Sequence, residues 1–204
     1  MILNAFERPF AMPGQKIGLL GGSFDPAHAG HLHISKQALR RFGLDQVWWL
    51  VSPGNPLKPR GPAGMQARIA MAKALVQDPR IVICDIEARL NTTFTAETLG
   101  RILPLYPGVH FVWLMGADNL VQFHRWDRWR DIAQTIPLGV LGRPDQMVRA
   151  GLSRTAVHFA TSRFRMRDAR ALPFAHPPAW CLIAGPMVDV SSSEIRNKGD
   201  WNNA

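Results

Sequence analysis

The stretch Gly21-Gly22-Ser23-Phe24-Asp25-Pro26-Ala27-His28-Ala29-Gly30-His31 decides how this chain is organised. The apolar run 17–20 before it is typical of a buried parallel strand, and the glycine pair predicts that the strand breaks into a turn. Glycines at this point let the backbone approach a ligand closely and adopt a positive φ. Residues 31–42 then place apolar side chains near helical spacing. The stretch therefore predicts a strand, a turn and a helix, with His28 and His31 in or just before the first helical turn.

The start of that helix is a candidate site for a bound anion. Unpaired backbone N–H groups and the positive end of the helix dipole meet there. The imidazoles of His28 and His31 add side-chain donors for phosphate oxygens. A glycine turn is common in α/β proteins, and a single histidine at a helix start is usually a cap or a solvated side chain. The combination of turn and two histidines favours a nucleoside triphosphate.

Composition predicts a single globular domain. The chain has 204 residues, of which 47% are hydrophobic, enough to bury one sizeable core. We expect residues 16–204 to form this domain, and residues 1–15 to be an N-terminal extension for which disorder is an open alternative. No apolar run has the length that a bilayer requires, and the first residues lack the apolar core of a signal peptide, so we expect a cytoplasmic protein without a membrane partner. Cys84 and Cys181 lie in apolar runs and are expected to be buried free thiols.

The formal net charge of +9 suits two kinds of anionic partner. Basic chains bind nucleic acid by releasing counterions, but positive charge also steers small anionic substrates into a cleft. The arginine-rich stretch 143–170 has no aromatic and glycine pattern of an RNA-binding motif, and it is interpreted as a solvated helical face. We therefore expect no nucleic-acid partner. The sequence has no signal for a particular oligomeric state.

Strand-like and helix-like segments alternate along the chain. The strand-like runs are 17–20, 47–51, 81–86, 109–114, 136–141 and 180–184, and the helix-like segments are 31–42, 64–77, 95–103 and 119–134. This alternation predicts an α/β fold of the Rossmann-like, doubly wound type: a mainly parallel sheet with helices on both faces. Its ligand is expected at the carboxyl ends of the strands, where the strand order reverses.

Five segments, in order, resemble the nucleotidylyltransferases that carry an H-x-G-H signature, and among them the nicotinate-nucleotide adenylyltransferase branch. The first is the stretch 21–31 quoted above. The others are 93–99, similar to the family's S-Y-T-x-x-T-L; 116–129, similar to G-x-D…W-x-x-W; the Arg143-Pro144 pair; and 191–196, similar to I-S-S-T-x-I-R. The resemblance implies transfer of AMP from ATP to nicotinate mononucleotide, giving deamido-NAD and pyrophosphate.

The resemblance also implies roles for particular residues. The catalytic groups would be His28, His31, Lys58 and Arg196. ATP would be bound by Gly21, Gly22, Ser23, Phe24, Asp118, Ser192 and Ser193. Nicotinate mononucleotide would meet Thr95 at its carboxylate, Trp126 at its ring and, as a weaker candidate for its phosphate, Arg68. Mg²⁺ would arrive with ATP, without ligands from protein side chains.

Two features of this site remain open in the sequence. Where the family has P-P-H-K or P-P-H-R, this chain has Asn55-Pro56-Leu57-Lys58, so that one donor is lost while the cation is kept. Trp126 and Trp129 are three residues apart, so they share a face if that segment is helical, and core packing is the alternative to ring stacking.

Three alternative functions follow from the same residues. A related adenylyltransferase would act on nicotinamide mononucleotide or on phosphopantetheine. A noncatalytic nucleotide- or RNA-binding protein belongs to another class, and the presence of His28, His31 and Arg196 together argues against it.

Overall fold

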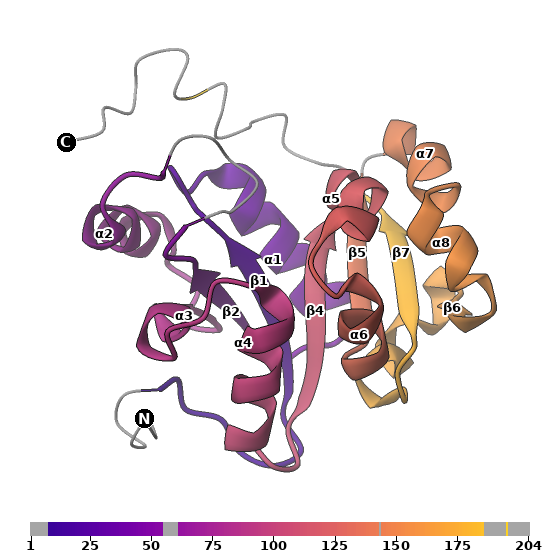
Figure 1. Cartoon of the computed structure of the whole chain (residues 1–204), viewed down its shortest axis with the longest axis horizontal. Coiled ribbons are helices and arrows are strands. Elements are labelled where there is room, and N and C mark those ends of the chain that lie inside the picture. Colours follow the sequence, from indigo (N-terminus) through magenta and orange to yellow (C-terminus); the bar gives the residue numbers. More distant parts are fainter. Residues whose placement is uncertain (1–7, 55–60, 143, 186–194, 196–204) are drawn as a thin grey trace.

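One sheet of seven parallel strands forms the centre of the computed structural model, which describes residues 8–54, 61–142, 144–185 and 195 (Figure 1). The strand order is β3-β2-β1-β4-β5-β7-β6. The bounds are β1 Lys16–Gly22, β2 Gln46–Val51, β3 Ile81–Cys84, β4 His110–Gly116, β5 Leu138–Gly142, β6 Arg163–Phe164 and β7 Trp180–Ala184. Six of these strands were predicted; the two-residue β6 was not, because it is too short for a pattern.

The strand order reverses at β1. From β1 the chain moves outward to β2 and β3, and then returns to β4 on the other edge of β1. The connections after β1 and β4 therefore leave in opposite directions and open a crevice between the carboxyl ends of these two strands. This is the doubly wound topology that the alternation predicted.

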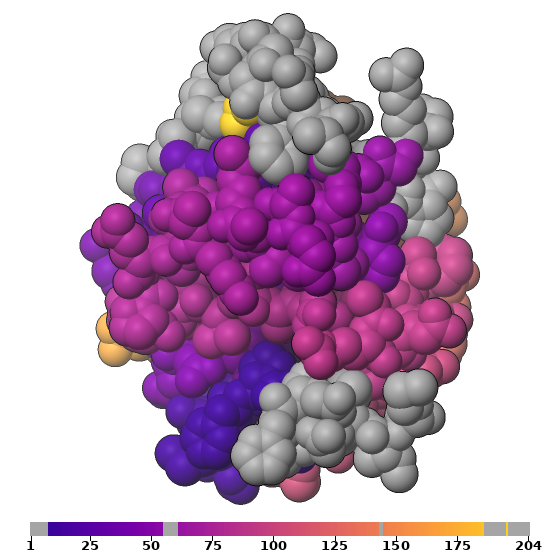
Figure 2. Space-filling model, turned by 90° about the vertical axis from the view of Figure 1, so that its left-hand side faces the viewer, coloured from indigo at the N-terminus to yellow at the C-terminus, as the bar shows by residue number. Residues whose placement is uncertain are grey.

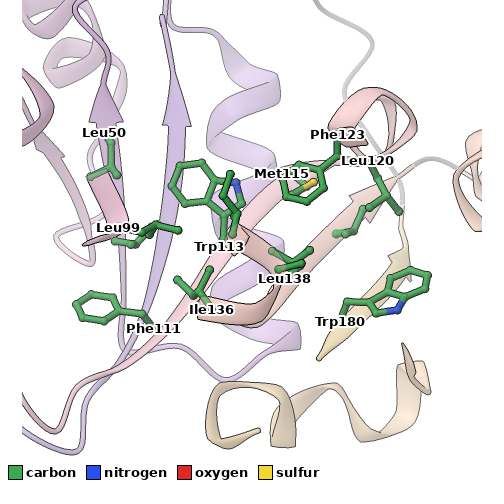
Figure 3. Close-up of a cluster of buried hydrophobic side chains, with 14 of the residues drawn as sticks. Leu50, Leu99, Phe111, Trp113, Met115, Leu120, Phe123, Ile136, Leu138 and Trp180 are labelled. Carbon is green, nitrogen blue, oxygen red and sulfur yellow. The ribbon is translucent and has the colours of Figure 1, made fainter. Parts of the chain in front are cut away.

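Buried side chains alternate between the two faces of the sheet. In β1, Ile17 and Leu19 belong to the core under the helices between Thr95 and His158. Leu20 belongs to the core under the helices Ala29–Arg41 and Met65–Leu75. Trp48 and Trp49 of β2 divide in the same way. Figure 3 shows the first of these cores, with Trp113 of β4 in its middle and Leu99 and Met115 on either side. Both faces are therefore covered by helices, as predicted, and the central strands β1, β2, β4, β5 and β7 are buried on both sides, whereas β6 at the edge is not.

The helices cover these faces in short pieces. Their bounds are α1 Ala29–Arg41, α2 Met65–Leu75, α3 Ile86–Arg89, α4 Thr95–Ile102, α5 Ala117–Gln122, α6 Trp129–Thr135, α7 Met147–Gly151 and α8 Arg154–His158, with 3₁₀ segments η2 Leu103–Leu105, η3 Phe123–Arg125, η4 Pro144–Gln146, η5 Ala160–Ser162 and η6 Met166–Phe174.

The prediction of one continuous helix over 119–134 is wrong. The segment divides into α5, η3 and α6. Trp126 is extended at ψ 145°, and Arg128 is left-handed at φ 49°, so the helical hydrogen bonds cannot continue through them. Periodicity alone could not detect this break, since no proline or glycine marks it.

The arginine-rich stretch is also not a single helical face. Arg149, Arg154, Arg163 and Arg167 are exposed, as predicted for solvated residues, but they lie on α7, α8, β6 and η6 in turn. Arg163 stacks over the ring of Trp180 at 5.0 Å.

Residues 8–15 are ordered against the amino end of the sheet. The Arg8 side chain donates to the Leu105 carbonyl at 2.6 Å, and the Tyr106 hydroxyl donates to the Pro9 carbonyl at 2.8 Å. The Gly14 N–H donates to the Gly108 carbonyl at 2.7 Å. Figure 2 shows this segment in indigo at the end of the molecule opposite to α2. The structure thus places residues 8–15 against the sheet, and residues 1–7 of the predicted N-terminal extension lie outside the described part of the chain.

The expectation for the two cysteines is confirmed. Cys84 and Cys181 are free and buried. Among the described helices, none is long and apolar enough to cross a membrane.

Glycine at position 139 allows α1 to approach β5, and its replacement tests that close packing. A Cβ at Gly139 would lie 2.8 Å from the ring of Phe42, which is fully buried. We expect Gly139→Ala to lower the free energy of unfolding by about 1–3 kcal/mol, because the ring cannot move without disturbing the core. Denaturant unfolding measures this.

Gly100→Ala is the matched control. Its Cβ would have no atom within 4 Å, and Gly100 lies inside α4, so the change should stabilise by about 0.5–1 kcal/mol. Equal effects of the two changes would contradict the packing argument.

Candidate active site

The turn after β1 is shaped by an aromatic floor and by one residue with positive φ. That residue is Phe24, at φ 46°, whereas β1 continues through Gly22. The strand ends in a turn at the glycine pair, as predicted, but Gly21 and Gly22 are its last two residues and neither adopts a positive φ. The ring of Phe24 stacks on Trp49 at 4.8 Å and contacts His31 at 4.8 Å, and this packing holds a bulky residue in a backbone conformation that it rarely adopts.

Glycine at position 21 is required for a different reason. A Cβ there would lie 2.6 Å from the ring of Trp113 on β4, which is buried. At Gly22 a Cβ would meet the Phe24 ring at 3.3 Å. Both glycines let the backbone lie directly on aromatic rings, and the Phe24 side chain is buried rather than directed toward a ligand.

His28 and His31 cap helix α1 reciprocally. His28 is the N-cap residue, and its Nδ1 accepts from the Gly30 N–H at 3.1 Å. His31 Nδ1 accepts from the His28 N–H at 3.2 Å, and the two ring centroids are 3.9 Å apart. Ser35 fixes the same turn, since its hydroxyl donates to the His31 carbonyl and accepts from the Trp49 indole at 2.7 Å. The predicted place of both histidines at the helix start is confirmed.

This capping fixes the tautomer of both rings. Because each Nδ1 accepts a backbone N–H, the neutral imidazole carries its proton on Nε2. Both rings therefore carry an Nε2–H donor at the N-terminal end of this 13-residue helix, where the helix dipole favours an anion.

Asp118 lies in the first turn of α5, across the crevice from α1. It lies two residues after the last residue of β4, Gly116, and a Cβ on that glycine would overlap the Asp118 carboxylate, so the glycine permits its position. The side chain is exposed on the wall of a cavity of about 370 Å³. The cavity is lined by Ala117, Asp118, Val121, Gln122, His124, Arg125, Gln146 and Arg149.

Helix α4 begins at Thr95 without a side-chain cap. Its N-cap residue is Phe94, which has no acceptor, and no side chain of the described residues caps the helix. The N–H groups of its first turn and the half-buried Thr95 hydroxyl form a set of donors. This arrangement suits a carboxylate of a ligand.

Trp126 lies between η3 and α6 and is not on one helical face with Trp129, contrary to the shared-face alternative. It is half-buried, with its ring edge-on to Trp113 at 6.3 Å and tilted on Phe123 at 5.2 Å. Trp113 also supports Gly21, so a single buried indole separates Trp126 from the turn after β1. The Nε1 atom of Trp113 has no hydrogen-bond partner among the described residues. The sequence analysis missed this bridging residue, because a tryptophan inside an apolar strand looks like any core residue.

The proposed phosphate contact of Arg68 conflicts with its surroundings. The side chain is 1% exposed, and its Nε and Nη1 atoms donate to backbone carbonyls. This burial argues against the direct contact, for which Arg68 was the weaker candidate implied by the resemblance.

Four predicted site residues lie outside the described part of the chain. These are Lys58, Ser192, Ser193 and Arg196, and the departure at Leu57 is outside it as well. Their roles stay predictions.

A buried acid beside α4 escaped the sequence analysis. Glu87 is 4% exposed, and its Oε1 lies 3.3 Å from the Thr98 hydroxyl, which donates to the Thr92 hydroxyl at 2.9 Å. Thr92 in turn donates to the Glu87 carbonyl from its hydroxyl at 3.4 Å and from its N–H at 2.9 Å. Burial raises the pKa of Glu87 to about 7, although the Thr98 hydrogen bond opposes the shift. The Glu87 carboxyl contacts the Thr98 hydroxyl and no cation among the described residues, so burial favours its protonated form.

The signal for this cluster was the acid itself. Glu87 follows a strand-like run and precedes the threonines of the 93–99 segment, in a place where an unpaired charge would be costly.

The described residues offer no cluster for a resident metal. Among them no three His, Cys, Asp or Glu side chains are grouped so that they could hold an ion. The N-terminal end of α1, with the positive end of its dipole, suits the oxygens of a polyphosphate better than a bare cation.

Comparison with known proteins gives a consistent set of relatives. Residues 19–198 match the family model described as cytidylyltransferase-like. The chain is 60% identical over 193 residues to a probable nicotinate-nucleotide adenylyltransferase of Roseobacter denitrificans, covering 95% of this chain and 97% of that protein. It is 48% identical over 197 residues to the protein of the same name from Parvibaculum lavamentivorans, covering 96% and 98%.

A solved structure shares the fold at low identity. The nicotinic acid mononucleotide adenylyltransferase of Plasmodium falciparum, complexed with NaAD, matches with a TM-score of 0.66 and 18% identity, covering 90% of this chain and 83% of that one.

The buried Glu87 carboxyl predicts a pH dependence of stability. In the unfolded chain it ionises near 4.5, and in the folded chain near 7. Between these values the folded chain binds the extra proton, so this group makes the free energy of unfolding fall as pH rises through that window. Glu87→Gln removes the effect. We expect the Tm of the variant, relative to the parent chain, to rise from pH 4.5 to 7 and then level off in thermal melts.

Glu97→Gln, which removes an exposed carboxyl from the neighbouring helix α4, is the control, and its Tm difference from the parent chain should not change with pH. A Tm difference for Glu87→Gln that does not change with pH would show that the acid is not held protonated.

Proposed function

This chain belongs to the cytidylyltransferase-like family, in the branch of the nicotinate-nucleotide adenylyltransferases, and we propose that it transfers AMP from ATP to nicotinate mononucleotide, giving deamido-NAD and pyrophosphate. The observation that carries the proposal is the reciprocal capping of α1 by His28 and His31. It places two Nε2–H donors at a helix start, beside the crevice where the strand order reverses.

The reaction needs positioning and charge stabilisation rather than a protein nucleophile. The 5′-phosphate oxygen of nicotinate mononucleotide attacks the α-phosphorus of ATP in line, and the bond from that phosphorus to the bridging oxygen breaks as pyrophosphate leaves. We assign the triphosphate to the first turn of α1, with His31 nearest the α-phosphate. Charge that develops on the leaving group is then met by donors already fixed in place.

The remaining predicted groups keep their roles within this proposal. Lys58 and Arg196 would neutralise the polyphosphate, and Ser192 and Ser193 would contact it through hydroxyl and N–H groups. Asp118, exposed in the 370 Å³ cavity, would accept from ribose hydroxyls. Mg²⁺ bound to the phosphate oxygens of ATP would supply further charge neutralisation, which is consistent with a turn that offers donors rather than metal ligands.

The uncapped start of α4 supports the choice of the acid over the amide. A carboxylate accepts hydrogen bonds at both oxygens, so it fits the first-turn N–H groups and the Thr95 hydroxyl. A carboxamide turns a donor toward donors, and an unmatched polar group costs about 1–3 kcal/mol. We therefore propose nicotinate mononucleotide rather than its amide, with Trp126 stacking on the pyridine ring.

Pyrophosphate release tests the proposal directly. ATP and Mg²⁺ are offered with nicotinate mononucleotide, nicotinamide mononucleotide and phosphopantetheine in parallel. We expect turnover with the first and a preference of ten- to a hundredfold or more over the amide in kcat/KM. Folded protein that is inactive with all three would favour a noncatalytic nucleotide-binding role. The partners proposed are thus ATP and the mononucleotide, in the cytoplasm.

His31→Ala tests the role of the capping histidine in catalysis. We expect kcat to fall by about 10²-fold or more, with a smaller change in the KM for ATP, because the contact strengthens as the α-phosphorus is attacked. His31→Asn retains an acceptor for the His28 N–H and separates capping from catalysis. His33→Ala, on the same helix, is the control. A normal kcat with a raised KM would identify His31 as a ground-state binder only.

Two variants separate recognition of the carboxylate from recognition of the ring. Thr95→Val removes one donor and should narrow the acid-to-amide ratio, whereas Trp126→Ala should weaken both mononucleotides and leave the ratio nearly unchanged. Values of kcat/KM for both substrates on both variants decide the point. A ratio that shifts only in Trp126→Ala would reverse the two assignments.

A further inference from the structure

Arg68 connects three backbone segments, one of which is the turn between β1 and α1. That turn leads to the helix start that we assign to the triphosphate. Arg68 lies in the first turn of α2 and is 1% exposed. Its Nε donates to the Ala63 carbonyl at 2.7 Å, and its Nη1 donates to the Ser52 carbonyl at 3.0 Å and also to the Ser23 carbonyl. One guanidinium group therefore joins the turn after β1, the end of β2 and the residues before α2.

Asp25 strengthens the same connection from the other side. The carboxylate is 7% exposed, its Oδ1 accepts from the Ala63 N–H at 3.3 Å, and its charge acts on Arg68. Gly22 and Val51 are paired in register, and the Ser52 N–H donates to the Gly22 carbonyl at 3.0 Å. The position of Ser23 is thus set by a hydrogen-bonded cluster that also includes Ser52 and Ala63.

Burying the charged Arg68 guanidinium costs free energy, which its hydrogen bonds must offset. Burial lowers the pKa of Arg68, although the negative charge of Asp25 opposes that shift. The planar guanidinium presents several N–H groups in a rigid fork, so it fixes the relative positions of its acceptors in a way that a flexible ammonium cannot. Each carbonyl would lose a partner if the fork were removed.

We propose that Arg68 is a positioning residue for ATP, which acts through the Ser23 carbonyl to hold the turn Ser23–Asp25 against the start of α1. The inference rests on the proposed placement of the triphosphate at that helix start. It assigns Arg68 to the nucleotide without direct contact, in place of the mononucleotide contact that the sequence suggested. Its effect should be confined to ATP, since Thr95 and Trp126 belong to elements that Arg68 does not bond in the described structure.

The test compares equilibrium binding of the two substrates in Arg68→Ala and Arg68→Lys. Calorimetry with a non-hydrolysable ATP analogue and, separately, with nicotinate mononucleotide gives the two Kd values. We expect Kd for the analogue to rise at least tenfold in both variants and Kd for the mononucleotide to change less than twofold. Methylguanidinium at millimolar concentration should restore analogue binding to Arg68→Ala, whereas methylammonium, which has the charge without the fork, should not.

Arg101→Lys is the matched control, because Arg101 also donates to a backbone carbonyl, that of Leu90, but outside the turn. It should leave both Kd values unchanged. Arg68→Lys serves as the folded variant if Arg68→Ala unfolds. Equal losses for both substrates would reduce Arg68 to a general stability role, and a loss confined to the mononucleotide would restore the direct contact. A parent chain that binds the analogue but makes no pyrophosphate would refute the proposed function while leaving the ATP-specific effect of Arg68 to be judged by binding.

Discussion

The position of β1 constrains the rest of this structure. It pairs with β2 on one edge and β4 on the other, and side chains from both of its faces enter separate cores. A strand enclosed in this way leaves no room for side chains at its carboxyl end, where a Cβ on Gly21 would run into the ring of Trp113. The backbone that leaves β1 therefore lies directly on aromatic rings, and its polar groups are directed by the residues that follow.

Among the residues that follow β1, the pair His28 and His31 both caps helix α1 and supplies hydrogen-bond donors. The same Nδ1 atoms that satisfy backbone N–H groups at the start of α1 leave the protons of both rings on Nε2. A serine or aspartate N-cap would satisfy the backbone N–H groups at the helix start equally well, but it would add no N–H donor toward a phosphate. Stability of the helix start and donation to an anion are thus performed by one pair of side chains.

Two buried ionisable side chains support the two ends of the crevice in contrasting ways. Arg68 satisfies carbonyls of the turn after β1, and Glu87 satisfies hydroxyls beside the start of α4. Neither contacts solvent appreciably, and both would be costly without these partners. The start of each helix at the site is therefore fixed by a group that the substrates need not touch.

Local patterns in the sequence determined six of the seven strands, their order and the place of His28 and His31, because alternation of apolar runs and a turn before a helix depend only on near neighbours. They did not determine the break at Trp126 and Arg128, the positive φ at Phe24 or the burial of Arg68, since each of these follows from packing between elements far apart in the chain. The crevice itself is of this second kind. It is formed by residues from distant segments: Gly21, Asp118 and Trp126. The reversal of strand order beside β1 brings them to the carboxyl ends of the strands, where Trp113 packs between Gly21 and Trp126.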